Sequence, residues 1–187
     1  MPNYRRWRIP GGSYFFTAVT ASRRPILTPD LGRRCLHEAL AEVQAATPFE
    51  IFAIVLLPDH VHSIWNLPIG DDDFSSRWAQ VKSTFTKKYL AGGGVEAPIS
   101  ASRRMKGDRG VWQRRFWEHL IRDNDDLKRC VDYLHYNPVK HGLVSRVRDW
   151  SWSSFQRFVA LGEYTQNWGE GVVIAHDSRL FGDEQFL

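Results

Sequence analysis

Residues 54–65, IVLLPDHVHSIW, decide both the fold and the chemistry expected of this chain. An apolar run reaches the turn residues Pro58 and Asp59, and it begins again with two histidines separated by one valine. So short a connection predicts an antiparallel hairpin, with strands at 49–57 and 60–67. Because side chains on a strand alternate between its faces, His60 and His62 project from the same side. This pair is typical of metal ligands, although so short a motif also occurs on ordinary strands.

The flanking sequence supplies the other elements of an α+β domain. Apolar patterns predict, in order, a strand at 14–20, a helix from Thr28 to about residue 46, a helix with an apolar stripe from 78 to 89, a strand at 111–121, and a helix with a stripe from 127 to 134. The order βαββαβ is the ferredoxin-like arrangement, followed here by one further helix. It predicts an antiparallel sheet with helices packed on one face. After Pro138 we expect a helical or irregular C-terminal tail.

Length and composition favour one compact unit. The chain has 187 residues, 43% of them hydrophobic, which suits a single domain at 1–145 with a basic arm at 1–12 and a tail at 146–187 packed on the domain. The two cysteines, Cys35 and Cys130, have no CxxC partner and are expected to be buried thiols in a reducing compartment. No apolar run approaches the roughly 18 residues of a membrane span. We therefore expect a cytoplasmic protein.

The last predicted helix carries a second pair of polar residues. Tyr133 and Asn137 are four residues apart, so they share one edge of the helix, beside its apolar stripe. Each also has an ordinary interpretation, because Tyr133 suits a core boundary and Asn137 suits a helix end before Pro138. Tyr136 points further from the stripe and is the alternative candidate for a catalytic tyrosine.

Taken together, these motifs give the chain a family resemblance. From about residue 4 to about residue 158, the sequence resembles the REP-associated tyrosine transposases, which are HUH single-strand DNA transposases with one catalytic tyrosine. Five matching regions occur in the expected order: YRR with PGGSYFFT (4–6 and 10–17), LPDHVH (57–62), VKSTFT (81–86), WQRRFWEH (112–119) and YLHYNPVKHGLV (133–144). One departure is Leu57, where many relatives carry methionine; it exchanges one apolar residue for another.

The resemblance implies the roles of individual residues. It assigns His60, His62 and Asn137 as ligands of a divalent metal, Mg²⁺ or Mn²⁺, and Tyr133 as the nucleophile. It implies a metal-dependent endonuclease and strand transferase that cleaves single-stranded, hairpin-forming palindromic repeats through a 5′-phosphotyrosine. His119, which shares a strand face with Trp117, is either a neighbour of the metal site or a histidine at the edge of the core.

Two other functions remain open from the residues themselves. One is a rolling-circle or relaxase-type nickase, which shares the histidine pair. The other is a non-catalytic nucleic-acid-binding module, which would stack bases on an exposed sheet and would not need Tyr133 and Asn137 near the histidines.

The excess of basic residues suits a nucleic-acid partner. The net charge is +4, and Arg and Lys residues that lie off the apolar stripes are candidates for phosphate contacts. The candidates are Arg5, Arg6, Arg8, Lys82, Lys87, Arg114 and Arg115. Aromatic residues in the tail, such as Trp150 and Phe158, must be covered, and we expect the tail to fold back on its own domain. That arrangement favours a monomer, with a dimer as the alternative.

Overall fold

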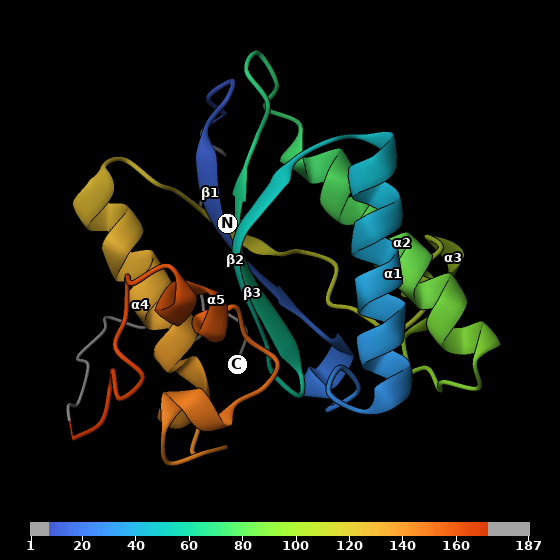
Figure 1. The fold of residues 1–187 in the computed structure, drawn as a ribbon. Coiled ribbons are helices and arrows are strands. Elements are labelled where there is room, and N and C mark those ends of the chain that lie inside the picture. The colour runs from blue at the N-terminus through green and yellow to red at the C-terminus, as the bar shows by residue number, and fades with distance from the viewer. Residues whose placement is uncertain (1–7, 172–187) are drawn as a thin grey trace.

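The computed structural model describes residues 8–171 of the chain (Figure 1). The main elements are β1 (Ser13–Val19), α1 (Asp30–Ala46), β2 (Glu50–Leu56), β3 (His60–Asn66), α2 (Phe74–Ala91), β4 (Trp117–Leu120) and α4 (Asn124–Lys140). The shorter ones are η1 (Ala21–Arg23), α3 (Ala101–Met105), η2 (Val147–Asp149) and α5 (Phe155–Ala160). Among the described residues, no helix is both long enough and apolar enough to cross a bilayer.

The four strands form one sheet in the order β2-β3-β1-β4, and each neighbouring pair is antiparallel. This confirms the α+β class, and the strand order is that of a ferredoxin-like βαββαβ unit. The β2–β3 connection is as short as the sequence predicts, and the Leu57 N–H donates to the His60 carbonyl at 2.9 Å. In the central pair, Thr17 of β1 lies opposite His62 of β3, and Val19 lies opposite His60.

The two helices within the βαββαβ unit, α1 and α2, cover one face of the sheet, as expected (Figure 1). Their apolar stripes bury residues such as Leu36 and Val81 against Phe16 and Trp65 of the strands. Trp65 stacks on Trp78 with the ring centroids 4.5 Å apart, an arrangement that adds about 0.5–1.5 kcal/mol to the burial itself. This face is the larger of two apolar clusters in the described chain.

The third long helix, α4, covers the opposite face together with α5 (Figure 1). Its stripe, which includes Val131 and Leu134, packs on Phe15, Val55 and Ile64. Alternation along β3 sends Ile64 and both histidines to this side, and Val61 and Trp65 to the other. The sheet is therefore covered by helices on both faces, and the histidine pair faces α4.

The strand predicted at 111–121 is much shorter in the structure. Only Trp117–Leu120 pairs with β1, while Trp112 makes an isolated bridge to Thr20. Between them, the Lys82 ammonium donates to the carbonyls of Gln113 and Arg115, at 2.9 and 3.3 Å. These are carbonyls that a continuous strand would use in its ladder, so a side chain of α2 replaces part of the predicted pairing.

Two helix ends also differ from expectation. Helix α1 begins at Asp30, two residues after Thr28, with Pro29 as its N-cap and no side-chain cap bond. Helix α4 continues through Pro138 to Lys140. Proline lacks only one helical hydrogen bond, and this helix ends instead where Gly142 adopts a φ of +66°, a conformation that favours glycine. The extra turn adds Lys140 and His141 to the end of the helix that carries Tyr133.

The described part of the tail packs on β2 and α4. The Leu56 N–H donates to the Trp152 carbonyl at 2.9 Å, and the Ser154 N–H donates to the Ile54 carbonyl at 2.8 Å. His135 of α4 bonds the Ser154 hydroxyl at 2.8 Å, and burial lowers its pKa to about 3, so this imidazole is neutral. The tail is thus joined to the sheet through backbone bonds and to α4 through a buried histidine.

A candidate metal and tyrosine site between β3 and α4

The two histidines of β3 lie side by side under α4. Their ring centroids are 4.8 Å apart, and their exposed fractions are 2% for His60 and 0% for His62. Each imidazole is held by a hydrogen bond at Nδ1: His60 by Asp59 Oδ1 at 2.6 Å, and His62 by Thr17 Oγ1 at 2.9 Å. With Nδ1 occupied in both rings, Nε2 is the nitrogen that each would offer to a ligand.

Asp59 is ionised, and its carboxylate orients the His60 ring. Burial raises the pKa of Asp59, but hydrogen bonds and charge from His60 and Arg23 outweigh it and lower the pKa to about 2. Arg23 forms a 2.9 Å ion pair with the other carboxylate oxygen. A carboxylate that fixes the ring behind it is the usual support of a metal-binding histidine. His60 Nε2 is buried and has no hydrogen-bond partner among the described residues, which is consistent with a ligand position.

Tyr133 and Asn137 come to the same place from α4. Tyr133 is fully buried, and its ring lies 5.4 Å from the His62 ring and 5.9 Å from Phe15. One turn beyond Asn137, His141 lies 5.2 Å from the His60 ring. Asn137 therefore sits on the helix between two residues that contact the two metal-ligand candidates.

The amide of Asn137 is the most informative polar group in this region. Asn137 is fully buried, and neither its oxygen nor its nitrogen has a hydrogen-bond partner among the described residues. A buried polar group without a partner costs about 1–3 kcal/mol, so the Asn137 amide calls for an explanation, and a bound ion or a catalytic role is one that fits beside two histidines. Together, the buried His60 Nε2 and the Asn137 amide fit a metal that takes nitrogen and oxygen ligands.

The competing tyrosine faces elsewhere. Tyr136 packs near Trp168 of the C-terminal segment, at 6.5 Å between ring centroids, and Gly169 lies against the same ring. Tyr133 instead contacts His62, so the two tyrosines occupy different sides of α4.

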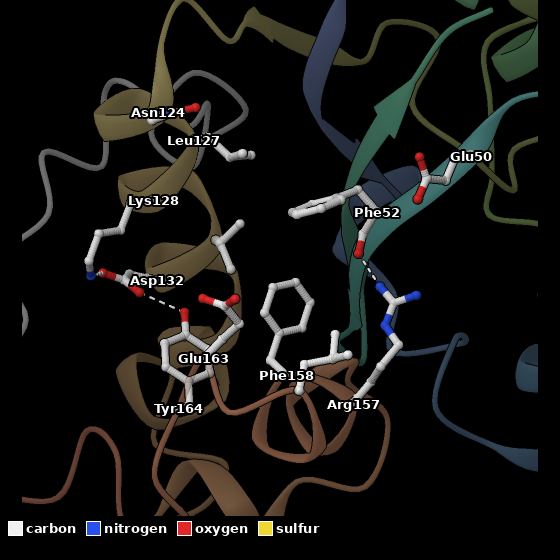
Figure 2. A pocket seen from close by; sticks show the side chains of 12 residues that line it. Glu50, Phe52, Asn124, Leu127, Lys128, Asp132, Arg157, Phe158, Glu163 and Tyr164 are labelled. Carbon is white, nitrogen blue, oxygen red and sulfur yellow. Dashed lines mark hydrogen bonds and ion pairs between the residues drawn. The ribbon is translucent and has the colours of Figure 1, made fainter.

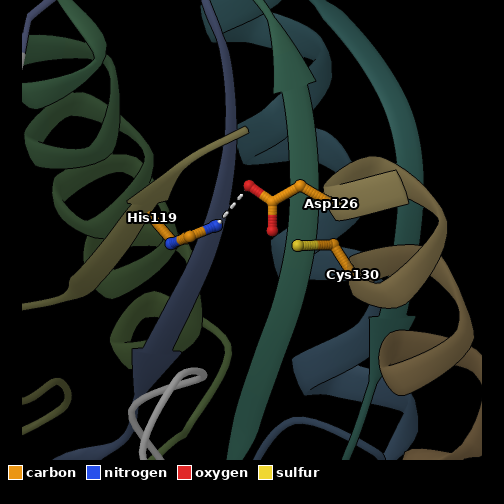
Figure 3. A group of neighbouring side chains, drawn as sticks. All are labelled: His119, Asp126 and Cys130. Atoms are coloured by element: carbon orange, nitrogen blue, oxygen red, sulfur yellow. Dashed lines mark hydrogen bonds and ion pairs between the residues drawn. The ribbon is translucent and has the colours of Figure 1, made fainter. Parts of the chain in front are cut away.

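His119 belongs to a separate cluster with Asp126 and Cys130 (Figure 3). His119 Nε2 lies 2.9 Å from Asp126, and the three potential ligand atoms lie within 4.8 Å of one another. Asp126 also accepts from the Arg122 N–H and from Arg129. Burial raises the pKa of the Cys130 thiol to about 12.

This cluster also lies at the other end of α4. Eleven residues separate Asp126 from Asn137, which is about 16 Å along a helix. His119 is therefore better described as an anchor of the helix start than as a neighbour of the histidine pair.

The seven basic residues predicted to contact phosphates lie in different places. Lys82, Lys87 and Arg114 line a cavity of about 460 Å³ between α2 and residues 107–114. Arg8 pairs with Asp72 at 3.5 Å and lies over the Phe74 ring, and Arg115 is exposed. Arg5 and Arg6 lie outside the described residues.

A larger cavity, of about 660 Å³, lies between β2, α4 and α5 (Figure 2). Its apolar residues include Phe52 and Phe158, and Tyr164 there donates to Asp132 at 2.6 Å. His60, His62, Tyr133 and Asn137 are not among the residues that line it. The buried ligand-type atoms, rather than this cavity, locate the candidate site.

No family model matches the chain. The sequence is 44% identical to a REP-associated tyrosine transposase of Escherichia coli K12 over 92% of this chain and 93% of the relative. The chain belongs to the REP-associated tyrosine transposases. A Haemophilus influenzae protein that carries the same family name provisionally is 42% identical over 90% of this chain and 94% of its own length.

The structural comparison agrees with this family. A solved REP-associated tyrosine transposase bound to a REP hairpin superposes with a TM-score of 0.76 at 42% identity, covering 95% of this chain and 96% of the other. Family membership makes the chain a DNA-cleaving transposase.

Several site residues of this transposase were not identified from sequence. Local sequence patterns alone place Asp59 in a turn, Thr17 on a strand, and Lys140 and His141 beyond the end of the helix. The pairing of Thr17 with His62 follows from strand register, which the sequence does not specify. Lys140 was missed because proline usually ends a helix, and here it does not.

Proposed function

We propose that this chain is a metal-dependent endonuclease and strand transferase that cleaves single-stranded, hairpin-forming repeats through Tyr133. The observation that carries the proposal is the position of Tyr133 against His62, with the buried and unpartnered Asn137 amide one helical turn away. A non-catalytic binding module has no use for this arrangement, because the buried amide would only cost stability.

His60 Nε2, His62 Nε2 and Asn137 Oδ1 would hold the metal. A divalent ion there would withdraw charge from a non-bridging phosphate oxygen and orient the scissile bond. Mixed nitrogen and oxygen ligands with phosphate suit Mg²⁺ or Mn²⁺. The Asp59 carboxylate accepts from His60 Nδ1 and so keeps that imidazole in the tautomer that presents Nε2, while Thr17 Oγ1 holds the orientation of the His62 ring through Nδ1.

The reaction is an exchange of phosphate esters. The Tyr133 oxygen forms a bond to phosphorus, and the bond from phosphorus to the 3′ oxygen breaks. The leaving oxygen keeps the electron pair and ends as a 3′-OH, and the phenol proton is passed to it through solvent. The phosphotyrosine retains the energy of the broken ester, so a 3′-OH can reverse the step without ATP.

Hairpin DNA is the partner proposed for this chain. The related transposase of known structure is bound to a REP hairpin. On this chain, Lys82, Lys87 and Arg114 form a basic cavity wall that we propose contacts phosphates, together with Arg5, Arg6, Arg8 and Arg115.

These contacts predict a salt effect. The double variant Lys87→Ala/Arg114→Ala should weaken hairpin binding and reduce the slope of log affinity against log salt by about one to two units. Fluorescence anisotropy across a salt series measures this. An unchanged slope would assign both side chains to solvated surface; exposed Lys106→Ala serves as the control because it lies outside the cavity lining.

The decisive test is a pair of tyrosine variants. With end-labelled hairpin DNA and Mg²⁺ or Mn²⁺, Tyr133→Phe should bind normally but form no nick and no covalent adduct on a denaturing gel. Tyr136→Phe should keep most of the activity, because that ring faces the C-terminal segment. An adduct that persists in Tyr133→Phe and vanishes in Tyr136→Phe would overturn the assignment.

A further inference from the structure

The last turn of α4 brings a cation to the tyrosine oxygen. Lys140 Nζ donates to the Tyr133 hydroxyl at 3.1 Å, and the same ammonium lies 4.7 Å from the centre of the Tyr133 ring. Tyr133 is fully buried, whereas Lys140 is an exposed residue whose side chain folds back over the ring. Positions 133 and 140 are two turns apart, so the contact exists only because α4 continues through Pro138.

Phosphate exchange at a tyrosine creates a charge problem that this contact addresses. During cleavage, the phenol oxygen gains negative character as it loses its proton and approaches phosphorus. During rejoining, the same oxygen leaves phosphorus with the electron pair of the broken bond. A donor aimed at the atom where charge develops stabilises the transition state in both directions.

We infer that Lys140 is a catalytic residue that stabilises the negative charge on the Tyr133 oxygen in cleavage and in rejoining. This inference rests on the proposed function. The lysine donates a hydrogen bond and a positive charge, and it neither forms nor breaks a covalent bond. In cleavage the phenol proton still reaches the 3′ oxygen through solvent, and in rejoining the proton of the 3′-OH returns to the tyrosine.

A structural interpretation of Lys140 makes different predictions. A lysine in the last turn of a helix interacts favourably with the helix dipole, and this effect on stability is small at an exposed position. In that case, loss of the charge would lower the midpoint of unfolding slightly and leave the reaction rates unchanged. The two interpretations are therefore separated by measuring stability and rate on the same variant.

The first experiment replaces the charge and keeps the chain length. Lys140→Met should bind hairpin DNA with near-normal affinity, and it should cleave about 10–100-fold more slowly, as expected for a lost hydrogen bond from a charged group. Rejoining should slow by a similar factor when wild-type and variant covalent complexes are isolated and given a 3′-OH strand. Lys128→Met is the matched control, because Lys128 lies on the same helix and pairs with Asp132 away from the site.

The second experiment restores the cation without restoring the residue. Lys140→Ala leaves space beside Tyr133, and added ethylammonium should recover part of the cleavage rate in a saturable manner, whereas ethanol should not. A residue that only supported the fold would not respond in this way. Lys140→Arg should retain more activity than Lys140→Met, since it keeps a positive donor.

The outcomes separate this inference from the function on which it rests. If Tyr133→Phe still forms the adduct, the proposed nucleophile is wrong. If Tyr133→Phe is inactive while Lys140→Met cleaves and rejoins at wild-type rates, or if ethylammonium has no effect on a slowed Lys140→Ala, the nucleophile stands and the role of Lys140 is refuted.

Discussion

Two buried polar side chains, one on each side of the sheet, differ in their hydrogen bonding. On the α2 side, Arg77 is 4% exposed, and its five N–H donors make five hydrogen bonds. On the α4 side, Asn137 is fully buried, and neither amide atom has a partner among the described residues. Asp71 accepts two of the Arg77 bonds. Chiefly because of these bonds, the pKa of Asp71 falls to about 2. Arg77 is thus complete within the protein, and Asn137 is not.

The difference shows that the two faces of the sheet serve different purposes, one for folding and one for the site. The α1 and α2 face is mainly aromatic and aliphatic, and the rings of Trp78 and Trp112 each pack T-shaped against a phenylalanine ring. The α4 face buries two histidines and an amide in one place. We therefore expect variants on the first face to change folding, and variants on the second to change metal binding and reactivity.

The largest effect on stability should follow from Phe85→Ala on the α2 face. Phe85 is fully buried and packs on Tyr89 and Trp112, so its truncation should lower the free energy of unfolding by about 3–5 kcal/mol. Urea denaturation measures this loss. Metal affinity of the molecules that remain folded should be unchanged, since no site residue is touched.

Asn137→Leu is the matched variant on the opposite face. It keeps the branching and the number of heavy atoms of the side chain and removes two buried polar atoms without partners, so its free energy of unfolding should equal or exceed that of the wild type. If it destabilises the protein as much as Phe85→Ala does, Asn137 is part of the core and the contrast between the faces fails.

A smaller effect is expected from Asp59→Asn, which leaves all three proposed ligands in place. Loss of the carboxylate behind His60 should weaken Mn²⁺ binding by about 10–100-fold, because such partners fix the ring and strengthen it as a ligand. Isothermal titration calorimetry measures the affinity. Asp149→Asn, which removes an exposed ion pair with Arg146, should bind Mn²⁺ as the wild type does. Equal affinities in both variants would remove Asp59 from the site.

The parts of this molecule that were predictable are those set by local pattern. Alternation in residues 60–66 identified one strand face with both histidines, and the Pro58-Asp59 turn identified the antiparallel hairpin. The helical spacing of Tyr133 and Asn137 placed them on one edge of α4. Two such patterns, far apart in sequence, became informative together through the family resemblance.

The parts that were missed depend on contacts between distant segments. Lys82 replaces strand pairing at Gln113 and Arg115, and nothing near residue 113 in the sequence indicates this. The end of α4 depends on Gly142 rather than on Pro138, so the helix gained the turn that carries Lys140. The partner of His62 required the register of β1, which follows from the assembled sheet.

The backbone bonds from residues 152–154 to β2 have a consequence for association. In the order β2-β3-β1-β4, the two outermost strands are β2 and β4, and an uncovered outer strand can pair with another chain. Leu56 and Ile54 already bond to Trp152 and Ser154, and β4 is only four residues long. Little unpaired strand is left at either edge for a second copy to extend. The tail therefore works against edge-to-edge aggregation, as well as burying its own aromatic residues.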